Sequence, residues 1–524
     1  MERKTKVLEN IQDIIKRNEL VKREKLLPKH KKILEASKVV EKFIRTKQRK
    51  VYGGIAINET IKLKDSKQKI YEDNDDIPDW DFYSPEPIKD AWELMIEFDK
   101  LGYKSIQMKE AFHANTYKIK IENYEGELAD ISYIWNNYYY KIPTIMINGI
   151  NYVSPVYQIM DMYRAFVNPM LGWFKIEKYY HRASILEELY MKPRKLPDVK
   201  KYFTEKKSEP KMIELKNSLI KNVISNNDNI IVIGSYAYNY LMTYSKVPDF
   251  QKRRVSSDRI SLITNNLSET VTSIIDHLED HLTKDKKSKK SSKSRKTNLI
   301  SGGIKTRNSV SNINNSTRLS SDENLNNGSL IKKIKFYPFL ELYGRSVEIL
   351  YDMKPLVKVY ETDICYPYFT NNKLNIGSYH LIMLYLMANK FRTKVTKNEY
   401  QSKVLNYMIQ NLNYAREYWF RKNNKIGIEK SPFQELQSIC MGDDFETGFQ
   451  KYIKKKVKYQ VFLDRLPPNA DNKKYIENAK NYIYPNRSGN PEIKNIPKLM
   501  QKESGELLKL YPELKSSLLK NSKI

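Results

Sequence analysis

With 524 residues, 40% of them hydrophobic, the chain allows about two to four packed domains, but its apolar runs are too short for a membrane span. Its two cysteines, Cys365 and Cys440, exclude a disulfide framework and a structural zinc site, which fits a reducing compartment. The 92 lysines and arginines exceed the 62 acidic residues by 30, which favours a polyanionic partner such as nucleic acid.

The first part of the chain predicts a helical segment and then an α+β module. The expected elements, in chain order, are a helix over 5–48, strands at 50–52 and 78–84, a helix at 88–102, strands at 116–121 and 127–134, and helices at 155–167 and 173–190. The first strand runs into Gly53-Gly54, a pair typical of a tight turn. We therefore predict a helical N-terminal segment at 1–48 and a domain at 49–195.

The same order of elements returns in the second part of the chain. A helix at 212–225 is followed by a strand at 230–233 ending in Gly234-Ser235, a strand at 257–264, a helix at 269–283, alternating segments over 336–352 and a helical segment from 376. The alternative is chance similarity of generic α/β segments. Because five landmarks share one order, we predict a second copy of the module at 212–392.

The remaining regions complete the predicted architecture. Residues 284–330 are basic and then rich in serine and asparagine, so we expect a disordered insertion that buries no core. Without 284–329 the chain still carries +22, so its folded parts are basic too. Residues 393–524 are predicted to be mainly helical, over 396–412, 413–424 and 447–458. The predicted fold class is α+β, with two tandem modules of mixed sheet and helices.

Three aspartates carry the chemistry of the first module. Asp79 and Asp81 are two apart at the start of a predicted strand, so both carboxylates point to one face, and Asp130 lies in a later strand. Crowded carboxylates are stabilised by divalent cations, and a third oxygen ligand would complete a two-metal site. Gly53 and Gly54 expose backbone N–H groups that can approach phosphates. The alternative is a solvated acidic turn, but the combined order of motifs favours a metal site.

This order of motifs resembles that of the DNA polymerase β-like nucleotidyltransferase superfamily. Members of that superfamily carry a Gly-Gly or Gly-Ser turn, an Asp-x-Asp pair and a third aspartate in this order. Within it, the chain is most similar to the poly(A) polymerases of large cytoplasmic DNA viruses. The resemblance covers about residues 30–190, and the family's second, inactive nucleotidyltransferase-like domain corresponds to 212–392.

The resemblance implies roles for the matched residues. Asp79 and Asp81 would bind two Mg²⁺ or Mn²⁺ ions, and Asp130 would bind the ion that activates the RNA 3′-hydroxyl. Gly53 and Gly54 would hold the phosphates of the substrate ATP. The implied activity is template-independent addition of AMP to the 3′ end of single-stranded mRNA.

The second module departs from the motif. Asp258 is aligned with Asp79, Ile260 with Asp81, and Glu348 stands near the place of Asp130. Because isoleucine cannot bind a metal, we expect this copy to be inactive. It could still offer a surface for RNA or for dimerisation.

Several other residues are weaker candidates. Lys178 and Arg182 are four apart on one helix face and could neutralise a triphosphate, although a solvated helix face is the simpler interpretation. Ser154 and Tyr157 could contact the nucleotide, although a helix N-cap is the simpler interpretation of Ser154 before Pro155. His277 and His281 have the i,i+4 spacing of zinc ligands but lack a third ligand, so solvated helix histidines are favoured.

The sequence leaves alternatives open for activity and assembly. Another transferase of the superfamily, of the CCA-adding or oligoadenylate-synthesising type, would share the same motif. A non-catalytic RNA-binding processivity subunit is disfavoured by the intact carboxylates. We expect a homodimer whose second module lines the RNA path, with a separate processivity or capping factor as the alternative. The expected location is the host cytoplasm, at the viral factory, or the virion.

Overall fold

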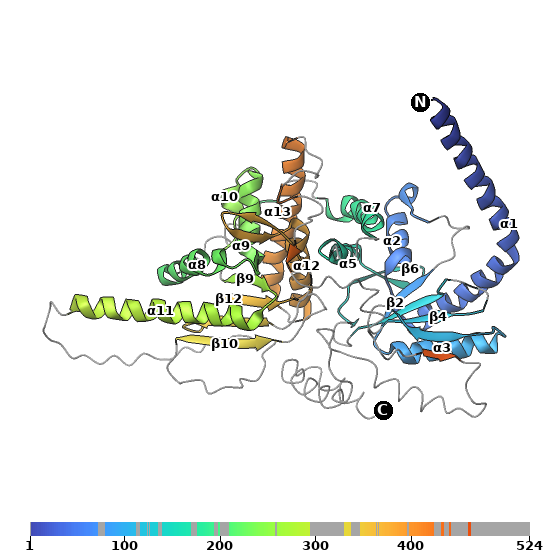
Figure 1. Ribbon diagram of the computed structural model, residues 1–524. Coiled ribbons are helices and arrows are strands. Elements are labelled where there is room, and N and C mark those ends of the chain that lie inside the picture. The colour runs from blue at the N-terminus through green and yellow to red at the C-terminus, as the bar shows by residue number, and fades with distance from the viewer. Residues whose placement is uncertain are drawn as a thin grey trace, which may run out of the picture. The chain divides into compact units, whose positions relative to one another are not determined.

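The computed structural model describes residues 2–71, 79–111, 116–122, 124, 126–134, 139–168, 175–192, 197–199, 209–256, 259–293, 330–336, 346–362, 364, 366–395, 398–423, 431–433, 440–441 and 460–462. The chain divides into two compact units (Figure 1). The first unit comprises Met1–Gln158 and Phe449–Tyr484, and the second unit comprises Ile159–Gly448 and Pro485–Ile524. Each unit contains one mixed eight-stranded sheet with helices, which confirms the predicted α+β class.

The first unit is built on a sheet of strand order β16-β3-β4-β5-β2-β1-β7-β6. Its strands are β1 (Lys50–Val51), β2 (Trp80–Ser84), β3 (Gln107–Glu110), β4 (Thr116–Lys120), β5 (Ala129–Tyr133), β6 (Thr144–Ile147), β7 (Ile150–Val153) and β16 (Gln460–Phe462). Its helices are α1 (Glu2–Lys47), α2 (Gly53–Lys62), the short 3-10 helix η1 (Ser66–Gln68) and α3 (Pro87–Lys100), and α5 (Pro155–Phe166) begins within it.

Alternation along β2 decides which face of this sheet is buried. Trp80 and Phe82 point into a core that α1 and α3 complete, with Ala36 and Trp92 among its buried members. Asp81 lies between them in sequence and therefore points to the opposite face, where it is only partly buried. The apolar side chains of β2 thus anchor the strand in the core, and its polar side chains lie on the opposite face, where they are available for a functional site.

The second unit is built on a sheet of strand order β10-β11-β12-β9-β8-β14-β13-β15. Its strands are β8 (Ile230–Ile233), β9 (Ile260–Thr264), β10 (Ile331–Phe336), β11 (Ser346–Tyr351), β12 (Lys354–Glu361), β13 (Tyr366–Asn371), β14 (Leu374–Gly377) and β15 (Cys440–Met441). Its helices are α7 (Ile176–Leu186), the π-helical turn η3 (Glu187–Met191), α8 (Pro210–Asn222), the 3-10 helix η5 (Ile224–Asn226), α9 (Gly234–Ser245), α10 (Phe250–Arg253), α11 (Leu267–Lys293), α12 (Tyr379–Val395) and α13 (Glu399–Asn423).

The two sheets repeat one pattern of strand pairing. β1 pairs antiparallel with β2 and parallel with β7, as β8 pairs antiparallel with β9 and parallel with β14. β2 is parallel to β5, as β9 is parallel to β12, and antiparallel strands extend both sheets outward. The predicted internal repeat is therefore present as a repeat of topology.

Several predicted boundaries differ from the structure. The two helices expected at 396–412 and 413–424 are one continuous helix, α13, because its buried positions keep helical spacing throughout. α11 continues to Lys293, well beyond the expected end at residue 283. The helix expected at 447–458 and most of the insertion at 284–330 lie outside the described residues. Across the described helices, none is both long and apolar enough to cross a membrane.

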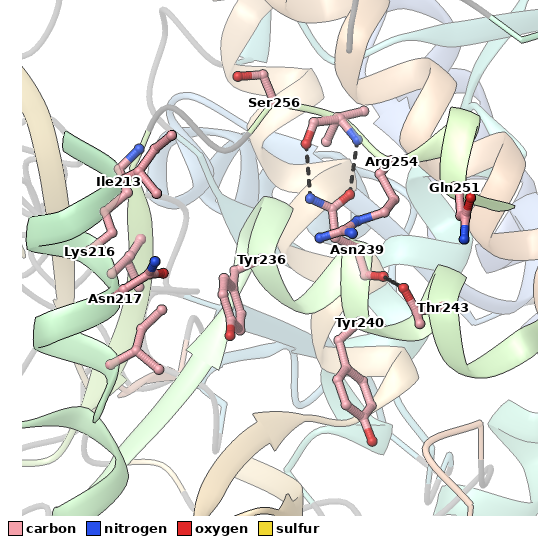
Figure 2. Close-up of a pocket in the computed structure, with 13 residues that line it drawn as sticks. Ile213, Lys216, Asn217, Tyr236, Asn239, Tyr240, Thr243, Gln251, Arg254 and Ser256 are labelled. Atoms are coloured by element: carbon pink, nitrogen blue, oxygen red, sulfur yellow. Dashed lines mark hydrogen bonds between the residues drawn. The ribbon is translucent and has the colours of Figure 1, made fainter. Parts of the chain in front are cut away.

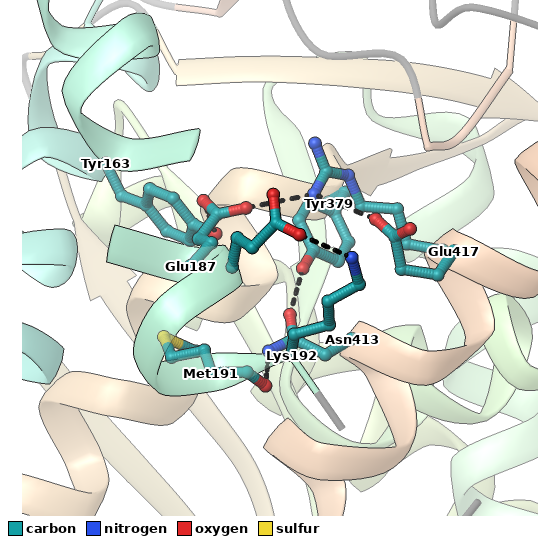
Figure 3. A network of polar contacts seen from close by, with 9 residues as sticks. Tyr163, Glu187, Met191, Lys192, Tyr379, Asn413 and Glu417 are labelled. Atoms are coloured by element: carbon teal, nitrogen blue, oxygen red, sulfur yellow. Dashed lines mark hydrogen bonds and ion pairs between the residues drawn. The ribbon is translucent and has the colours of Figure 1, made fainter. Parts of the chain in front are cut away.

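A buried polar network fastens η3 to α13 in the second unit (Figure 3). The carboxylate of Glu187 accepts a hydrogen bond from the Tyr163 hydroxyl at 2.6 Å and pairs with the Arg416 guanidinium at 3.1 Å. Arg416 also lies over the ring of Tyr379, 5.0 Å from its centroid. Burial raises the pKa of the Tyr163 hydroxyl well above its ordinary value, and Glu187 adds to this, so the hydroxyl remains a donor.

Candidate active site

Two of the predicted aspartates are direct neighbours across the first sheet. Asp81 on β2 is paired in register with Asp130 on the parallel strand β5. Residues in register on adjacent strands point to the same face, so both carboxylates leave the sheet on the side away from the α1–α3 core. Asp79 precedes Asp81 by two positions and is exposed. Burial raises the pKa of the Tyr124 hydroxyl, and the nearby carboxylates of Asp79 and Glu127 raise it further.

The Gly53 turn lies directly against Asp81. Gly53 has a φ of +73°, and a Cβ added to it would stand 2.0 Å from Oδ2 of Asp81. The backbone N–H of Tyr52 donates to the Asp81 carbonyl at 2.9 Å, which ties the turn to β2. Gly54 is packed equally closely, because an added Cβ would lie 2.1 Å from the Tyr71 hydroxyl. Only glycine can therefore bring the start of α2 this close to the carboxylates.

Lysines hold the acidic groups at the other edge of the site. Lys118, the cross-strand partner of Asp130 on β4, places Nζ 3.3 Å from Oδ2 of Asp130 and 3.4 Å from Oε1 of Glu127. Lys120 reaches the same Glu127 oxygen at 3.2 Å. Burial alone would lower the pKa of Lys118, but Asp130 and Glu127 outweigh it, so its pKa is raised. The Lys118 ammonium therefore offsets part of the charge of Asp130.

A strip of tyrosines borders the carboxylates on the same face. Tyr83, two residues beyond Asp81, stacks on Tyr52 with ring centroids 4.2 Å apart. Tyr157 meets Tyr83 edge-on at 6.5 Å. The Tyr52 hydroxyl shares a hydrogen bond with the Ser132 hydroxyl at 2.7 Å. The sequence analysis missed Tyr52, Tyr83 and Lys118, although the two-residue alternation from Asp81 to Tyr83 was a usable signal.

The remaining predicted residues lie at different places. Ser154 immediately precedes α5, and its carbonyl accepts hydrogen bonds from the N–H groups of Tyr157 and Gln158. Lys178 and Arg182 lie on α7 in the second unit, where Lys178 is exposed and Arg182 is 8% exposed. Arg182 is therefore not the solvated residue of the simpler interpretation.

His277 and His281 face α8. His277 shares a hydrogen bond with Ser218, and His281 lies 3.4 Å from Glu214. This agrees with ordinary residues of a helix face.

The carboxylate face fits a divalent-cation site by position and donor chemistry. Its three aspartates offer hard oxygen ligands from one turn and two adjacent strands. The close approach of Gly53 leaves Asp81 room that any larger residue would remove. Within the described part of the chain, no three His, Cys, Asp or Glu side chains converge on a single point. The aspartates therefore fit the ions in donor chemistry and in sharing one face, whereas their carboxylates are not drawn together and Asp130 is turned toward Lys118.

Strand register corrects the predicted equivalences in the second unit. Tyr52, before the first glycine turn, is opposite Asp81, and Ile233, before Gly234, is opposite Ser261. Ser261 therefore occupies the position of Asp81, and the predicted pairing of Ile260 with Asp81 is wrong by one residue. Ile260 instead points into the core, as Trp80 does. Asp258 lies outside the described residues.

By the same strand register, the second unit carries charges opposite to those of the first unit at the equivalent positions. Ser261 is paired with Lys358, so lysine occupies the position of Asp130. Lys358 is paired with Glu348, so Glu348 corresponds to Lys118 rather than to Asp130. Two residues before Ser261 stands Arg259, at the position of Asp79, and it forms an ion pair with Glu348. Arginine, serine and lysine thus replace the three aspartates, which excludes a matching cation site in this unit.

Two family models match the chain. The model described as "Poly(A) polymerase catalytic subunit" matches residues 38–172. A second, for the C-terminal part of the mimivirus ("APMV") poly(A) polymerase catalytic subunit, matches residues 297–503. The first match includes all three aspartates and both glycines of the site.

Curated relatives agree with these models. A relative named as poly(A) polymerase catalytic subunit, from Acanthamoeba polyphaga mimivirus, is 28% identical over 459 residues, covering 83% of this chain and 72% of the relative. A relative of the same name from African swine fever virus (isolate Pig/Kenya/KEN-50/1950) is 30% identical over 164 residues. That match covers 30% of this chain and about a third of the relative.

One solved structure shares the fold over nearly the whole chain. The crystal structure of the Megavirus polyadenylate synthase matches with a TM-score of 0.71 and 24% identity. The match covers 90% of this chain and 91% of that one. The fold of this chain, with its two sheet-containing units, is therefore one already seen in a viral protein.

Proposed function

We propose that this chain, which belongs to the family of viral poly(A) polymerase catalytic subunits, adds AMP from ATP to RNA 3′ ends at the carboxylate face of its first unit. The chain is a polynucleotide adenylyltransferase, and the finer assignment concerns where and how it acts. The observation that carries it is the in-register pair of Asp81 and Asp130 beside the Gly53 turn.

Asp79, Asp81 and Asp130 are the residues that would hold two Mg²⁺ or Mn²⁺ ions. When bound, such ions lower the pKa of an attacking hydroxyl and stabilise the charge of the departing pyrophosphate. The chain's own contribution is to present three carboxylates on one face. Lys118 orients Asp130 until a cation competes for its oxygen, since the ion pair spans 3.3 Å at a partly buried position.

The glycine turn and the tyrosine strip would position ATP. Gly53 and Gly54 begin α2, whose N-terminal N–H groups favour a phosphate. Tyr83, stacked on Tyr52, offers a ring surface two residues from Asp81, against which a nucleobase can pack. Tyr157, on the first turn of α5, meets Tyr83 edge-on, and Ser154 directly precedes that helix. The predicted contact of Ser154 with the nucleotide stays a prediction, as does neutralisation of a triphosphate by Lys178 and Arg182 on α7 of the second unit.

The proposed partner is the 3′ end of single-stranded RNA. The net charge of +30 supports it, because phosphate contacts by lysine and arginine dominate such binding. We also propose a homodimer that retains RNA through many additions, with a separate processivity factor as the alternative. The proposed location is the host cytoplasm.

Substitution of Asp81 tests the assignment. Asp81→Asn keeps the size of the side chain but removes its charge, so we expect AMP addition to fall at least about a hundredfold with RNA binding retained. Asp99→Asn, an exposed aspartate on α3, is the matched control and should leave the rate unchanged. Extension of labelled RNA with each nucleoside triphosphate in turn measures rate and base preference. Wild-type extension by the Asp81 variant would refute the assignment.

A further inference from the structure

A pocket of about 640 Å³ lies in the second unit between α8, α9 and the segment that follows α10 (Figure 2). Its walls include Lys216 and Asn217 from α8, Tyr236 and Tyr240 from α9, and Arg254 after α10. The volume lies within the range of about 300–1,000 Å³ that is usual for small-molecule sites. The pocket is separate from the reversed-charge position, because Ile260 lines it whereas Arg259 and Ser261 leave β9 on the other face.

The lining combines positive charge with aromatic surface. Lys216 and Arg254 are cationic, Tyr236 and Tyr240 present rings, and Asn217 adds an amide. Among the described residues that line the pocket, none is acidic. Such a lining suits a ligand with an anionic part and a flat ring, since cations attract phosphate and tyrosines stack on bases.

The wall that carries Arg254 is held in place by two hydrogen bonds. The Asn239 side chain donates from Nδ2 to the carbonyl of Val255 and accepts at Oδ1 from the N–H of Val255, each at 2.9 Å (Figure 2). This pair fixes the segment after α10 onto α9. Arg254 and Tyr236 consequently face a common space, and a ligand need not order the backbone before it binds.

We propose that this pocket is a nucleotide-binding site of the second unit. It would take one nucleoside phosphate, as a residue of the RNA strand or as free nucleotide, with the phosphate on Arg254 and Lys216 and the base on Tyr236 and Tyr240. The choice of ligand class rests on the proposed function. In the first unit a nucleotide is expected at carboxylates, whereas here its charge is met by the cationic side chains of Arg254 and Lys216, so binding needs no metal.

The test compares the full-length protein with Arg254→Ala and Lys252→Ala. Lys252 is the matched control, since it is an exposed cation two residues away on α10 and is paired with Asp249 rather than lining the pocket. Fluorescence anisotropy with a short single-stranded RNA forms one arm, and calorimetry with ATP the other, both with chelator present. We expect Arg254→Ala to lower the affinity for at least one of the two ligands about tenfold. Lys252→Ala should lower neither affinity by more than about twofold.

The salt dependence of the RNA arm distinguishes a phosphate contact from loss of structure. Losing one phosphate contact on a single strand makes the slope of log K against log salt shallower by about 0.7. A stacking role predicts that Tyr240→Ala weakens binding and that Tyr240→Phe restores it. Weaker binding of RNA by the variants identifies a nucleotide of the RNA strand as the ligand. Weaker binding of ATP alone identifies free nucleotide as the ligand.

Equal affinities of the Arg254 and Lys252 variants in both arms would overturn the inference. AMP addition at saturating RNA, measured in parallel, depends on Asp81 and not on Arg254. Arg254-dependent binding without AMP addition by the wild type would therefore refute the proposed function and leave the pocket assignment standing.

Discussion

Single residues at equivalent positions give the two units opposite chemistry. Asp81 and Asp130 present negative charge on one sheet, and Ser261 and Lys358 occupy those positions on the other. Lys358 is 2% exposed, and burial lowers its pKa well below its ordinary value, with Arg259 acting in the same direction. Glu348 opposes this shift. The position equivalent to the three aspartates thus holds an ion pair between Arg259 and Glu348, with Lys358 beside it.

The Glu348 carboxylate is predicted to stabilise the second unit. Its side chain is 11% exposed and neutralises the Arg259 guanidinium, which is 26% exposed, so Glu348→Gln leaves a partly buried cation uncompensated. We expect a loss of about 3 kcal/mol in the free energy of unfolding at pH 7. Chemical denaturation measures this free energy. The control variant Glu279→Gln, at an exposed position on α11, should unfold with almost the free energy of the wild type.

The pH dependence gives this prediction a second readout. Burial alone would raise the pKa of Glu348, but Arg259 and Lys358 outweigh it and lower the pKa below the ordinary 4.5. The stabilisation is therefore fully present above pH 4.5 and is lost as pH falls through the lower folded-state pKa. The gap between wild type and Glu348→Gln should be constant from pH 7 to about 5 and shrink below 4.5. A gap that widens in acid would contradict the ion-pair account.

At the scale of elements, the glycine turn before α2 brings a helix N-terminus to the carboxylates. Gly53 and Gly102 have similar positive φ values, +73° and +79°. An added Cβ at Gly102 meets nothing within 4 Å, whereas at Gly53 it collides with Asp81. The two positions therefore separate backbone strain from displacement of a site residue.

Gly53→Ala is predicted to remove activity, and Gly102→Ala to preserve it. Both variants should lose about 1 kcal/mol in unfolding free energy, because alanine is strained at positive φ. Only Gly53→Ala should lower AMP addition, by about a hundredfold, since Asp81 must move by about 1 Å. Thermal unfolding and primer extension measure the two effects. Full activity of Gly53→Ala would mean that the turn does not position Asp81.

The network between η3 and α13 carries another prediction at this scale. Arg416 and Glu187 are 9% and 17% exposed, so Arg416→Met leaves a buried carboxylate without its cation. We expect a loss of about 3 kcal/mol, with partial recovery in the double variant Glu187→Gln, Arg416→Met. Additive losses in a double-mutant cycle would show that the pair contributes little coupling.

The elements also show where prediction from sequence succeeds and where it stops. The common face of Asp79 and Asp81 and the turn at Gly53 could be predicted because their motif is local and strand alternation fixes the direction of the side chains. The second copy was misaligned by one residue, because Ile260 and Ser261 both follow the aspartate region and only strand pairing distinguishes them. Lys118 meets Asp130 across strands of the first sheet, and Glu348 meets Lys358 across strands of the second, so no spacing along the chain predicts either contact.

At the scale of the whole molecule, one sheet topology occurs twice, with different side chains at the positions of the proposed active site. The first unit keeps the carboxylates, and the second keeps the sheet and the glycine turn while losing the acidic ligands. The second sheet therefore lacks the acidic side chains that the proposed reaction requires. We predict that this unit instead holds RNA or a second copy of the chain.

A homodimer is the last prediction. Processive addition requires that RNA stays bound between steps. Symmetric self-association is the commonest oligomeric arrangement of soluble proteins, and two copies of this chain would offer RNA a larger basic surface than one. We expect light scattering at micromolar concentration to give a mass near two chains, and single-encounter extension with a trap RNA to give long tails without added protein. A mass near one chain together with tails of a few nucleotides would instead place processivity in a separate protein. Raising salt should shorten the tails in either case, since the basic surface holds the strand by its phosphates.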